Sequence, residues 1–68
     1  MWQKARALSE YTGMPLMTCM KALKLATFYN YNITACGVLR AWSLPGLHTY
    51  DDLVILSNGM PDPWEGEE

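Results

Sequence analysis

The residues that could support acid–base or nucleophilic chemistry are few in this chain. His48 is the one histidine, and Asp51 and Asp52 follow it closely enough to form a base–carboxylate set. A lone histidine beside a turn is more often a packing or solvent-exposed residue than a catalytic base. Cys19 has no histidine at helical spacing that would convert its thiol into a nucleophilic thiolate. The sequence therefore predicts no catalytic residue and no enzyme activity.

Metal and cofactor sites are also absent from the sequence pattern. One histidine and the separated cysteines Cys19 and Cys36 do not have the paired spacing of zinc ligands. The chain has no glycine-rich phosphate-binding loop. Both cysteines stand in helical contexts, which predicts buried free thiols in a reducing compartment, and a Cys19–Cys36 disulfide is the alternative. We expect no metal, no cofactor and a cytoplasmic location.

The residues from 12 to 26 predict the helix around which the rest of the fold is organised. Pro15 suits the first position of a helix, because its missing N–H would be unpaired there and its φ is already helical. Apolar residues then recur at the spacing that lines one helix face. They are Leu16, Cys19, Met20, Leu23 and Ala26, whereas Lys21 and Lys24 fall elsewhere on the helix.

A shorter helix is predicted before this one, over residues 2–11. Ala5, Leu8 and Trp2 face inward in this pattern, and Lys4 and Arg6 face water. Thr12 and Gly13 end the helix, since glycine readily adopts the left-handed conformation that closes a helix.

A third helix is predicted to end near Ser43. Either Asn30 or Asn32 can cap its start, and Pro45–Gly46 stops it. Gly37 inside this helix is unfavourable by about 1 kcal/mol relative to alanine, which indicates close packing against a neighbouring helix. The residues predicted to share its inner face are Ala35, Val38, Leu39 and Trp42.

The segment from Leu47 to Ser57 fits a helix or a strand. Thr49 and Asp52 have the spacing of a capping box, and Asp51 would complement the helix dipole, so a short fourth helix is preferred. Residues 53–56, Leu-Val-Ile-Leu, are equally compatible with a strand, and an exposed strand could pair with its twin in a homodimer.

Residues 60–68 contain two prolines, one glycine and four acidic residues, which predicts a flexible acidic tail. Trp64 in this tail either packs on the bundle or anchors a partner. We therefore divide the chain into a three-helix bundle over residues 1–44, an extension packed on it over 45–59, and the tail. The predicted fold class is all-α.

Charge is distributed unevenly along the chain. The cations are Lys4, Arg6, Lys21, Lys24 and Arg40, and before residue 50 only Glu10 opposes them, whereas the other six carboxylates lie beyond it. Such polarity indicates a tail that folds back, two faces for different partners, or simply a solvated surface. No apolar run approaches the roughly 20 residues of a membrane-spanning helix, and the first residues do not form a secretory signal.

Residues 5–23 carry the motif Ala5-x-x-Leu8-x-Glu10-x-Thr12-Gly13-x-Pro15-Leu16-Met17-x-Cys19-x-Lys21-Ala22-Leu23. This motif resembles the N-terminal domain of bacterial elongation factor Ts, a three-helix bundle of the ubiquitin-associated-like group also called TS-N. Ala35-Cys36-Gly37-Val38-Leu39-Arg40 resembles the family's Ala-Ile-x-Trp-Leu-Arg, so the resemblance covers about residues 5–42. Tyr31-Asn32 departs from the Asp-Ile of the family, and the loop before it is longer.

The resemblance implies binding and no catalysis. In elongation factor Ts this domain docks on the nucleotide-binding domain of elongation factor Tu, and a separate core, which we do not find here, performs nucleotide exchange. Related bundles bind ubiquitin through a Met-Gly-Phe or Met-Gly-Tyr loop. This chain has Thr12-Gly13-Met14-Pro15 at that place, so ubiquitin binding is not expected.

Methionines crowd the start of the central helix. Met14, Met17 and Met20 cannot all face a thin core, and flexible methionines suit variable apolar partners. Met20 either covers the C-terminal segment or contacts another protein. The predicted partner-binding residues are Met14, Met17, Met20, Val38, Trp42 and Trp64. These residues indicate a non-catalytic interaction module. We expect a small accessory or viral protein that docks on a larger protein.

Nucleic-acid binding is the alternative function. It would use Lys4, Arg6, Lys21, Lys24 and Arg40, with aromatic side chains between them. Five cations spread over three helices make a thin footprint, and the acidic half would repel phosphates, so this alternative is weaker.

Overall fold

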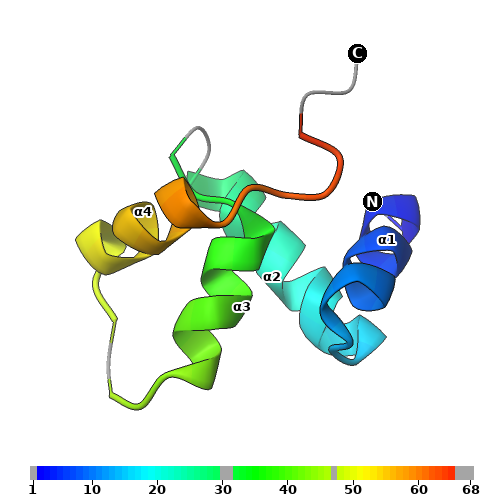
Figure 1. Cartoon of the computed structure of the whole chain (residues 1–68), viewed down its shortest axis with the longest axis horizontal. Coiled ribbons are helices and arrows are strands. Elements are labelled where there is room, and N and C mark those ends of the chain that lie inside the picture. The colour runs from blue at the N-terminus through cyan, green and yellow to red at the C-terminus, as the bar shows by residue number, and fades with distance from the viewer. Residues whose placement is uncertain (1, 30–31, 47, 66–68) are drawn as a thin grey trace.

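Four helices account for the fold of the described residues, which are 2–29, 32–46 and 48–65 of this computed structural model. They are α1 (Trp2–Thr12), α2 (Leu16–Tyr29), α3 (Ala35–Ser43) and α4 (Tyr50–Gly59). Figure 1 shows α1 and α4 at opposite ends, with α2 and α3 between them. No strand occurs in the described residues, so the all-α prediction is confirmed and the strand alternative for residues 53–56 is wrong.

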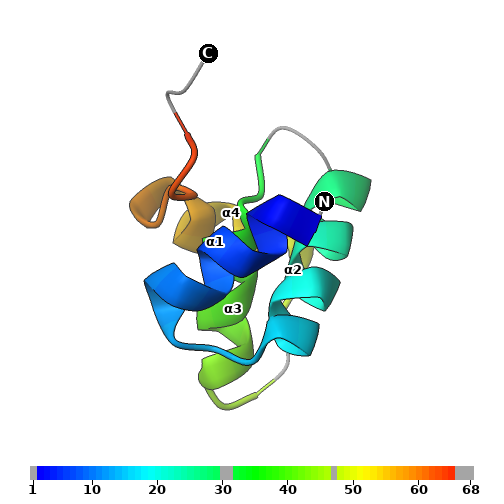
Figure 2. The ribbon, with the colours of Figure 1, turned by 90° about the vertical axis from the view of Figure 1, so that its right-hand side faces the viewer.

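The turn from α1 to α2 is fixed by backbone and side-chain hydrogen bonds of the last turn of α1. Gly13 has a φ of 75° and donates its N–H to the Ser9 carbonyl at 2.8 Å, which confirms the predicted left-handed helix end. The Thr12 hydroxyl donates to the Leu8 carbonyl at 2.8 Å and accepts the Met14 N–H at 3.2 Å. Figure 2 shows the result, with α1 crossing in front of α3 and α2 lying beside the N-terminal end of α1.

The core is made largely of small side chains. On α1, Ala5 and Leu8 are buried as predicted, whereas the side chain of Trp2 lies outside the described residues. The predicted inner face of α2 is confirmed, with Leu16 and Met20 half-buried at its edge. The buried apolar residues are Ala5, Leu8, Cys19, Ala22, Leu23, Ala26, Ile33, Ala35, Cys36, Val38, Leu39, Ala41 and Leu53. Because so many of them are small, the helices approach one another closely.

The far end of α2 differs from the prediction. The helix continues past Ala26 to Tyr29, because no glycine or proline interrupts residues 27–29. Aromatic residues have only slightly lower helix propensity than aliphatic ones, so the loss of apolar periodicity after Ala26 does not end the helix. The extension presents Phe28 and Tyr29 on the surface.

The start of α3 also differs. Thr34 is its N-cap, and the Thr34 hydroxyl accepts the Gly37 N–H at 3.0 Å, so the predicted caps Asn30 and Asn32 are wrong. Asn30 itself lies outside the described residues, and Asn32 lies in a turn before the cap. The predicted end at Ser43 is confirmed.

One residue of the predicted inner face of α3 does not lie in the core. Ala35, Val38 and Leu39 are buried, but Trp42 is 45% exposed, because it lies on the last turn of α3 at the edge of the bundle.

The helix α4 begins with the predicted capping box. The Asp52 N–H donates to the Thr49 hydroxyl at 3.3 Å, and the Thr49 N–H donates to the Asp52 carboxylate at 3.1 Å. The helix packs on α3 where Gly37 faces Ser57, and a Cβ atom at position 37 would lie 2.8 Å from the Ser57 Cα. The close packing predicted for Gly37 is therefore confirmed.

After α4 the chain runs past the start of α3 towards α1 (Figure 1). The Thr34 hydroxyl donates to the Met60 carbonyl at 2.7 Å, and the Cys36 N–H donates to the Asp62 carboxylate at 3.0 Å. Trp64 is half-buried against the core, and the Lys4 ammonium lies 5.4 Å from the centre of its ring. Of the two alternatives predicted for Trp64, the structure therefore shows packing on the bundle. Residues 66–68 of the predicted tail lie outside the described residues.

Candidate functional site

The outer face of α2 combines apolar and basic side chains. Met17 is 68% exposed and Phe28 is 79% exposed, and Lys21 and Lys24 are exposed between them. Positions 17, 21, 24 and 28 follow the i, i+4, i+7, i+11 spacing of a single helix stripe. This stripe lies opposite the buried residues of α2, so the helix has an apolar inner face and a partly apolar outer face.

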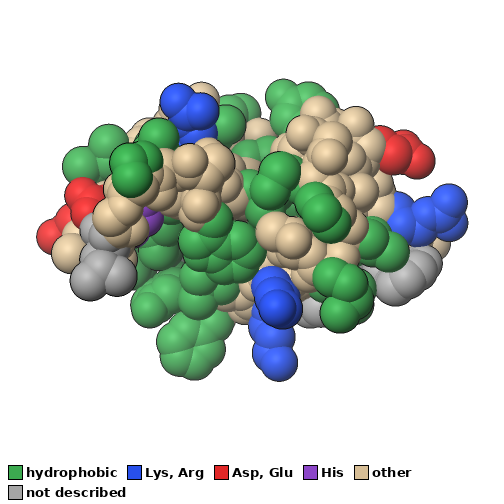
Figure 3. Space-filling model, turned by 90° about the horizontal axis from the view of Figure 1, so that it is seen from below, with side chains coloured by type: hydrophobic (Ala, Val, Ile, Leu, Met, Phe, Trp, Pro, Cys, Tyr) green, Lys and Arg blue, Asp and Glu red, His purple; other side chains and the backbone are tan. Residues whose placement is uncertain are grey.

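A groove lies between this outer face and α3. It has a volume of about 490 Å³ and is lined by Lys21, Lys24, Leu25, Phe28, Tyr29 and Trp42, and we call it the α2–α3 groove. The lining is almost entirely apolar, its charged groups are the two lysines, and no described carboxylate takes part. Figure 3 shows hydrophobic side chains gathered at the lower left of one face, with basic side chains beside them.

The groove continues into a row of aromatic rings. The rings of Phe28 and Tyr29 meet edge to face with centroids 5.3 Å apart, and Tyr29 lies 5.2 Å from Tyr50 on α4. We call Phe28, Tyr29 and Tyr50 the aromatic strip. It extends from the lysines of α2 to the first turn of α4, where Asp51 and Asp52 are exposed.

The predicted partner-binding residues do not form one surface. Met17 lies on the outer face of α2 and Trp42 lines the groove. Met14 and Met20 are half-buried against the core, where flexible side chains fill its irregular edge. Val38 has no exposed surface, so its prediction as a contact residue is wrong; it lies on the side of α3 that the bundle covers.

Trp64 lies at a second hollow. This hollow has a volume of about 500 Å³, with Leu23, Ala26 and Ile33 among its lining residues. Lys4 and Asp62 provide its charged groups. The side chain of Trp64 thus covers part of the bundle's own surface.

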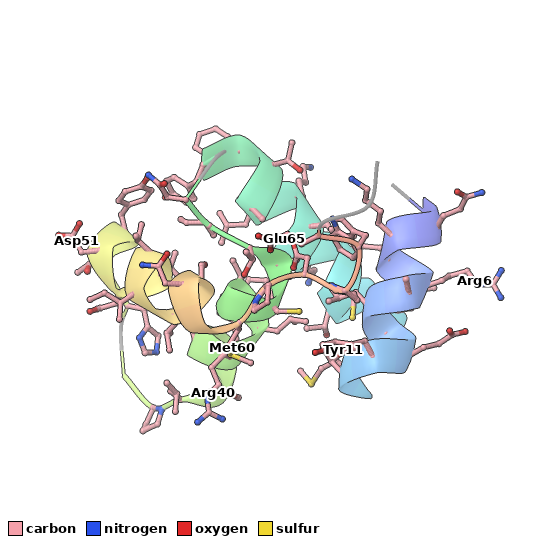
Figure 4. All side chains as sticks on the ribbon, turned by 45° about the horizontal axis from the view of Figure 1, so that its top comes forward. Arg6, Tyr11, Arg40, Asp51, Met60 and Glu65 are labelled. Atoms are coloured by element: carbon pink, nitrogen blue, oxygen red, sulfur yellow. The ribbon has the colours of Figure 1, made fainter. Side chains whose placement is uncertain are left out.

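The predicted nucleic-acid-binding residues are dispersed. Lys21 and Lys24 share the α2–α3 groove, whereas Lys4 lies against Trp64. Figure 4 shows Arg6 pointing outward from α1 and Arg40 lying on α3, well apart from each other. The fold therefore brings two of the five cations to a common groove and leaves the others on separate surfaces.

His48 and Asp52 line a common hollow, but each has a hydrogen-bond partner in the backbone. The His48 Nε2 atom lies 3.5 Å from the Leu44 carbonyl oxygen, and the Asp52 carboxylate accepts the Thr49 N–H of the capping box. Among residues 2–29, 32–46 and 48–65, no three His, Cys, Asp or Glu side chains lie together as metal ligands would.

Both cysteines are free and buried, as predicted, and they do not form the alternative disulfide. Burial raises the pKa of the Cys36 thiol to about 12, with a further contribution from the negative charge of Asp62. The thiol of Cys36 is thus fully protonated at neutral pH.

Sequence reasoning missed Leu25 and Phe28 as surface residues. The predicted helix ended at Ala26, which placed Phe28 in a loop, and Leu25 was not assigned to either face. The i+11 spacing from Met17 to Phe28 is the signal that could have found this stripe.

In the part of the chain that the structure describes, no helix is both long and apolar enough to cross a membrane. Comparison of the chain with protein-family models, with curated proteins and with solved structures found no match.

Proposed function

We propose that this protein is a non-catalytic interaction module that docks on an acidic amphipathic segment of a larger protein through the α2–α3 groove. The observation that carries the proposal is the composition of this groove, which is apolar, open to solvent and flanked by two lysines. Large exposed apolar side chains next to one another are typical of protein-binding surfaces. Phe28 and Trp42 belong to residue types that supply much of the binding energy when a partner buries them.

The shape and charge of the groove favour a helical partner. An amphipathic helix that places apolar side chains at i, i+3 or i+4, and i+7 fills a hydrophobic groove of this kind. Carboxylates beside that apolar face would lie against Lys21 and Lys24 and would select acidic partners over basic ones.

The resemblance to elongation factor Ts supports a more specific form of the proposal. In this form α1, α2 and α3 are a bundle of the ubiquitin-associated or TS-N type, α4 is an addition to it, and the protein acts in the cytoplasm. The partner is then a translation factor similar to elongation factor Tu. Of the contact residues predicted from the sequence, Met17 and Trp42 remain contact residues in this more specific proposal.

A titration with two designed peptides tests the proposal. Both peptides are amphipathic helices with the same leucines, and their polar positions are glutamate in one and lysine in the other. We expect the glutamate peptide to shift the amide resonances of Lys21, Lys24 and Phe28, and the lysine peptide to leave them in place. Purified elongation factor Tu serves as a third ligand for the more specific form.

Two variants provide the control for this titration. Phe28→Asp should reduce binding of the glutamate peptide at least tenfold, because it places a carboxylate in the apolar groove. Tyr11→Asp makes the same kind of change at an exposed aromatic residue of α1 and should bind like the wild type. Equal binding of both peptides, or resonance shifts confined to other surfaces, would contradict the proposal.

Nucleic-acid binding has less support, because its five cations lie on separate surfaces apart from Lys21 and Lys24. It makes a different prediction for the same protein sample. A single-stranded oligonucleotide would bind with an affinity that falls steeply with salt concentration, and this result would replace the proposal.

A further inference from the structure

We propose that a second copy of this chain binds to the aromatic strip and the adjoining groove, forming a dimer with two-fold symmetry. The inference goes beyond the proposed function, because it names a second copy of the chain as a partner for the same surface. The charges at the two ends of the aromatic strip identify a second copy of the chain as the partner.

The strip carries opposite charges at its ends. Lys21 and Lys24 lie at the α2 end, and Asp51 lies directly after Tyr50 at the α4 end. Figure 3 shows basic side chains at the bottom, hydrophobic ones at the lower left and acidic ones at the left edge of one face. A surface that is basic at one end, apolar in the middle and acidic at the other end is complementary to itself when turned by 180°.

Lys21 and Tyr50 both lie within about 11 Å of Phe28. Lys21 precedes Phe28 by seven residues, which is about 10 Å along α2 at about 1.5 Å per residue. On the other side, ring separations of 5.3 and 5.2 Å place Tyr50 within about 11 Å of Phe28. A two-fold axis near Phe28 therefore brings the lysines of each copy to Asp51 of the other.

Two-fold symmetry forms each of these contacts twice, as in any interface that uses the same patch on both subunits. Asp51 is available for this contact because the capping box of α4 uses Asp52. The aromatic rings then lie against those of the other copy, where they lose their contact with water. The Asp51 carboxylate of a second copy thus supplies the acidic group that the groove favours in a partner.

Analytical ultracentrifugation of the full chain tests this dimer. We expect the wild type to change from a 7.7 kDa monomer to twice that mass as its concentration rises from about 1 µM to about 1 mM, the range in which weak dimers form. The Lys21→Glu/Lys24→Glu variant and the Asp51→Lys variant should each stay monomeric, because each places like charges opposite one another.

An equimolar mixture of these two variants is the decisive sample. In the mixture the new glutamates face the new lysine, and the unchanged Asp51 faces the unchanged lysines, so the dimer should return. Arg6→Glu is the matched control on α1, at the opposite end of the molecule from Asp51, and should dimerise like the wild type (Figure 4). Circular dichroism checks that every variant keeps its helices.

Three results would overturn the inference. They are a wild type that stays monomeric at 1 mM, a mixture that stays monomeric, and a mass that keeps growing beyond twice the monomer. The last of these indicates open head-to-tail association. If the chain is monomeric but binds the glutamate peptide, the dimer is excluded and the proposed function remains. If the dimer forms and the peptide does not bind, the groove serves self-association and the proposed docking on a larger protein fails.

Discussion

Gly37 controls how closely α4 approaches α3. Its position faces Ser57, whose hydroxyl also accepts the Thr34 N–H at 2.9 Å. Ser57 is a buried polar residue, and this hydrogen bond satisfies its side chain. A side chain at position 37 would separate the two helices and break the hydrogen bond. A glycine that is unfavourable for the helix is therefore favourable for the fold.

We expect Gly37→Ala to destabilise the protein by about 1–3 kcal/mol, as is typical of overpacking. The new Cβ would lie 2.8 Å from the Cα and 2.9 Å from the N of Ser57, and backbone atoms cannot move aside easily. The loss should exceed the gain of about 1 kcal/mol in helix propensity. Urea unfolding measures the difference, and Gly59→Ala, which meets open space, should not lower the stability. Equal stability of the Gly37→Ala variant and the wild type would contradict the packing argument.

Cys36 makes the stability depend on pH in the alkaline range. Its pKa is about 12 in the fold and 9.0 ordinarily, so the unfolded chain loses the thiol proton first as the pH rises. The stabilising effect is complete below pH 9 and is lost between about pH 9 and pH 12. We expect the free energy of unfolding to fall there by up to about 1 kcal/mol per pH unit from this group. Cys36→Ala should show a shallower fall, and the same slope in both proteins would exclude this effect.

The two short helices α3 and α4 depend on side chains that cap their first turns. In α4 the cap is local, since Thr49 and Asp52 are three residues apart. In α3 the Thr34 hydroxyl binds the Gly37 N–H, and a distant residue, Asp62, binds the Cys36 N–H. Both arrangements satisfy N–H groups that a helix leaves without partners at its start.

Removal of the local cap should weaken α4. We expect Thr49→Ala to lower the stability by about 1 kcal/mol, because one side of the capping box is lost. Thr27→Ala is the control, as Thr27 is exposed within α2 and alanine suits a helix interior. Thermal unfolding followed by circular dichroism measures both changes. An unchanged melting temperature for Thr49→Ala would show that the box contributes nothing.

On the scale of the whole molecule, residues 60–64 join the two ends of the fold. Asp62 binds the start of α3, and Trp64 lies beside Lys4 of α1. Neither α1 nor α3 is long enough to be stable alone, so such contacts between distant segments contribute to their stability. The acidic end of the chain thus contacts the basic part through the hydrogen bonds of Met60 and Asp62 and the cation–π contact of Trp64.

We expect Asp62→Ala to lower the stability by about 1 kcal/mol, because the Cys36 N–H loses its partner. The change should also speed hydrogen exchange at the Cys36 amide and lower the pKa of its thiol, since the charge of Asp62 no longer opposes ionisation. Glu65→Ala, an exposed residue of the same segment, is the control and should leave both readouts unchanged. Full protection of the Cys36 amide in the Asp62→Ala variant would contradict this assignment.

The amino-acid sequence by itself determined the features that depend on residues within one or two helical turns. They include the helical class, the end of α1 at Gly13, the inner face of α2 and the capping box at Thr49. These features follow from periodicity and from contacts between residues at most four apart, which a sequence displays directly. The free state of the cysteines belongs with them, because few cysteines in helical patterns are typical of buried thiols.

Only the tertiary structure decided which apolar side chains remain uncovered. Val38 and Trp42 have the same helical phase in the sequence, yet one is buried and the other lies in the α2–α3 groove. The exposure of a side chain depends on which neighbouring segment covers it. Asp62 and Trp64, for example, contact residues that are more than 20 positions away from them in the sequence. The groove and the aromatic strip bring together residues of three helices, so no pattern within one helix could have predicted them.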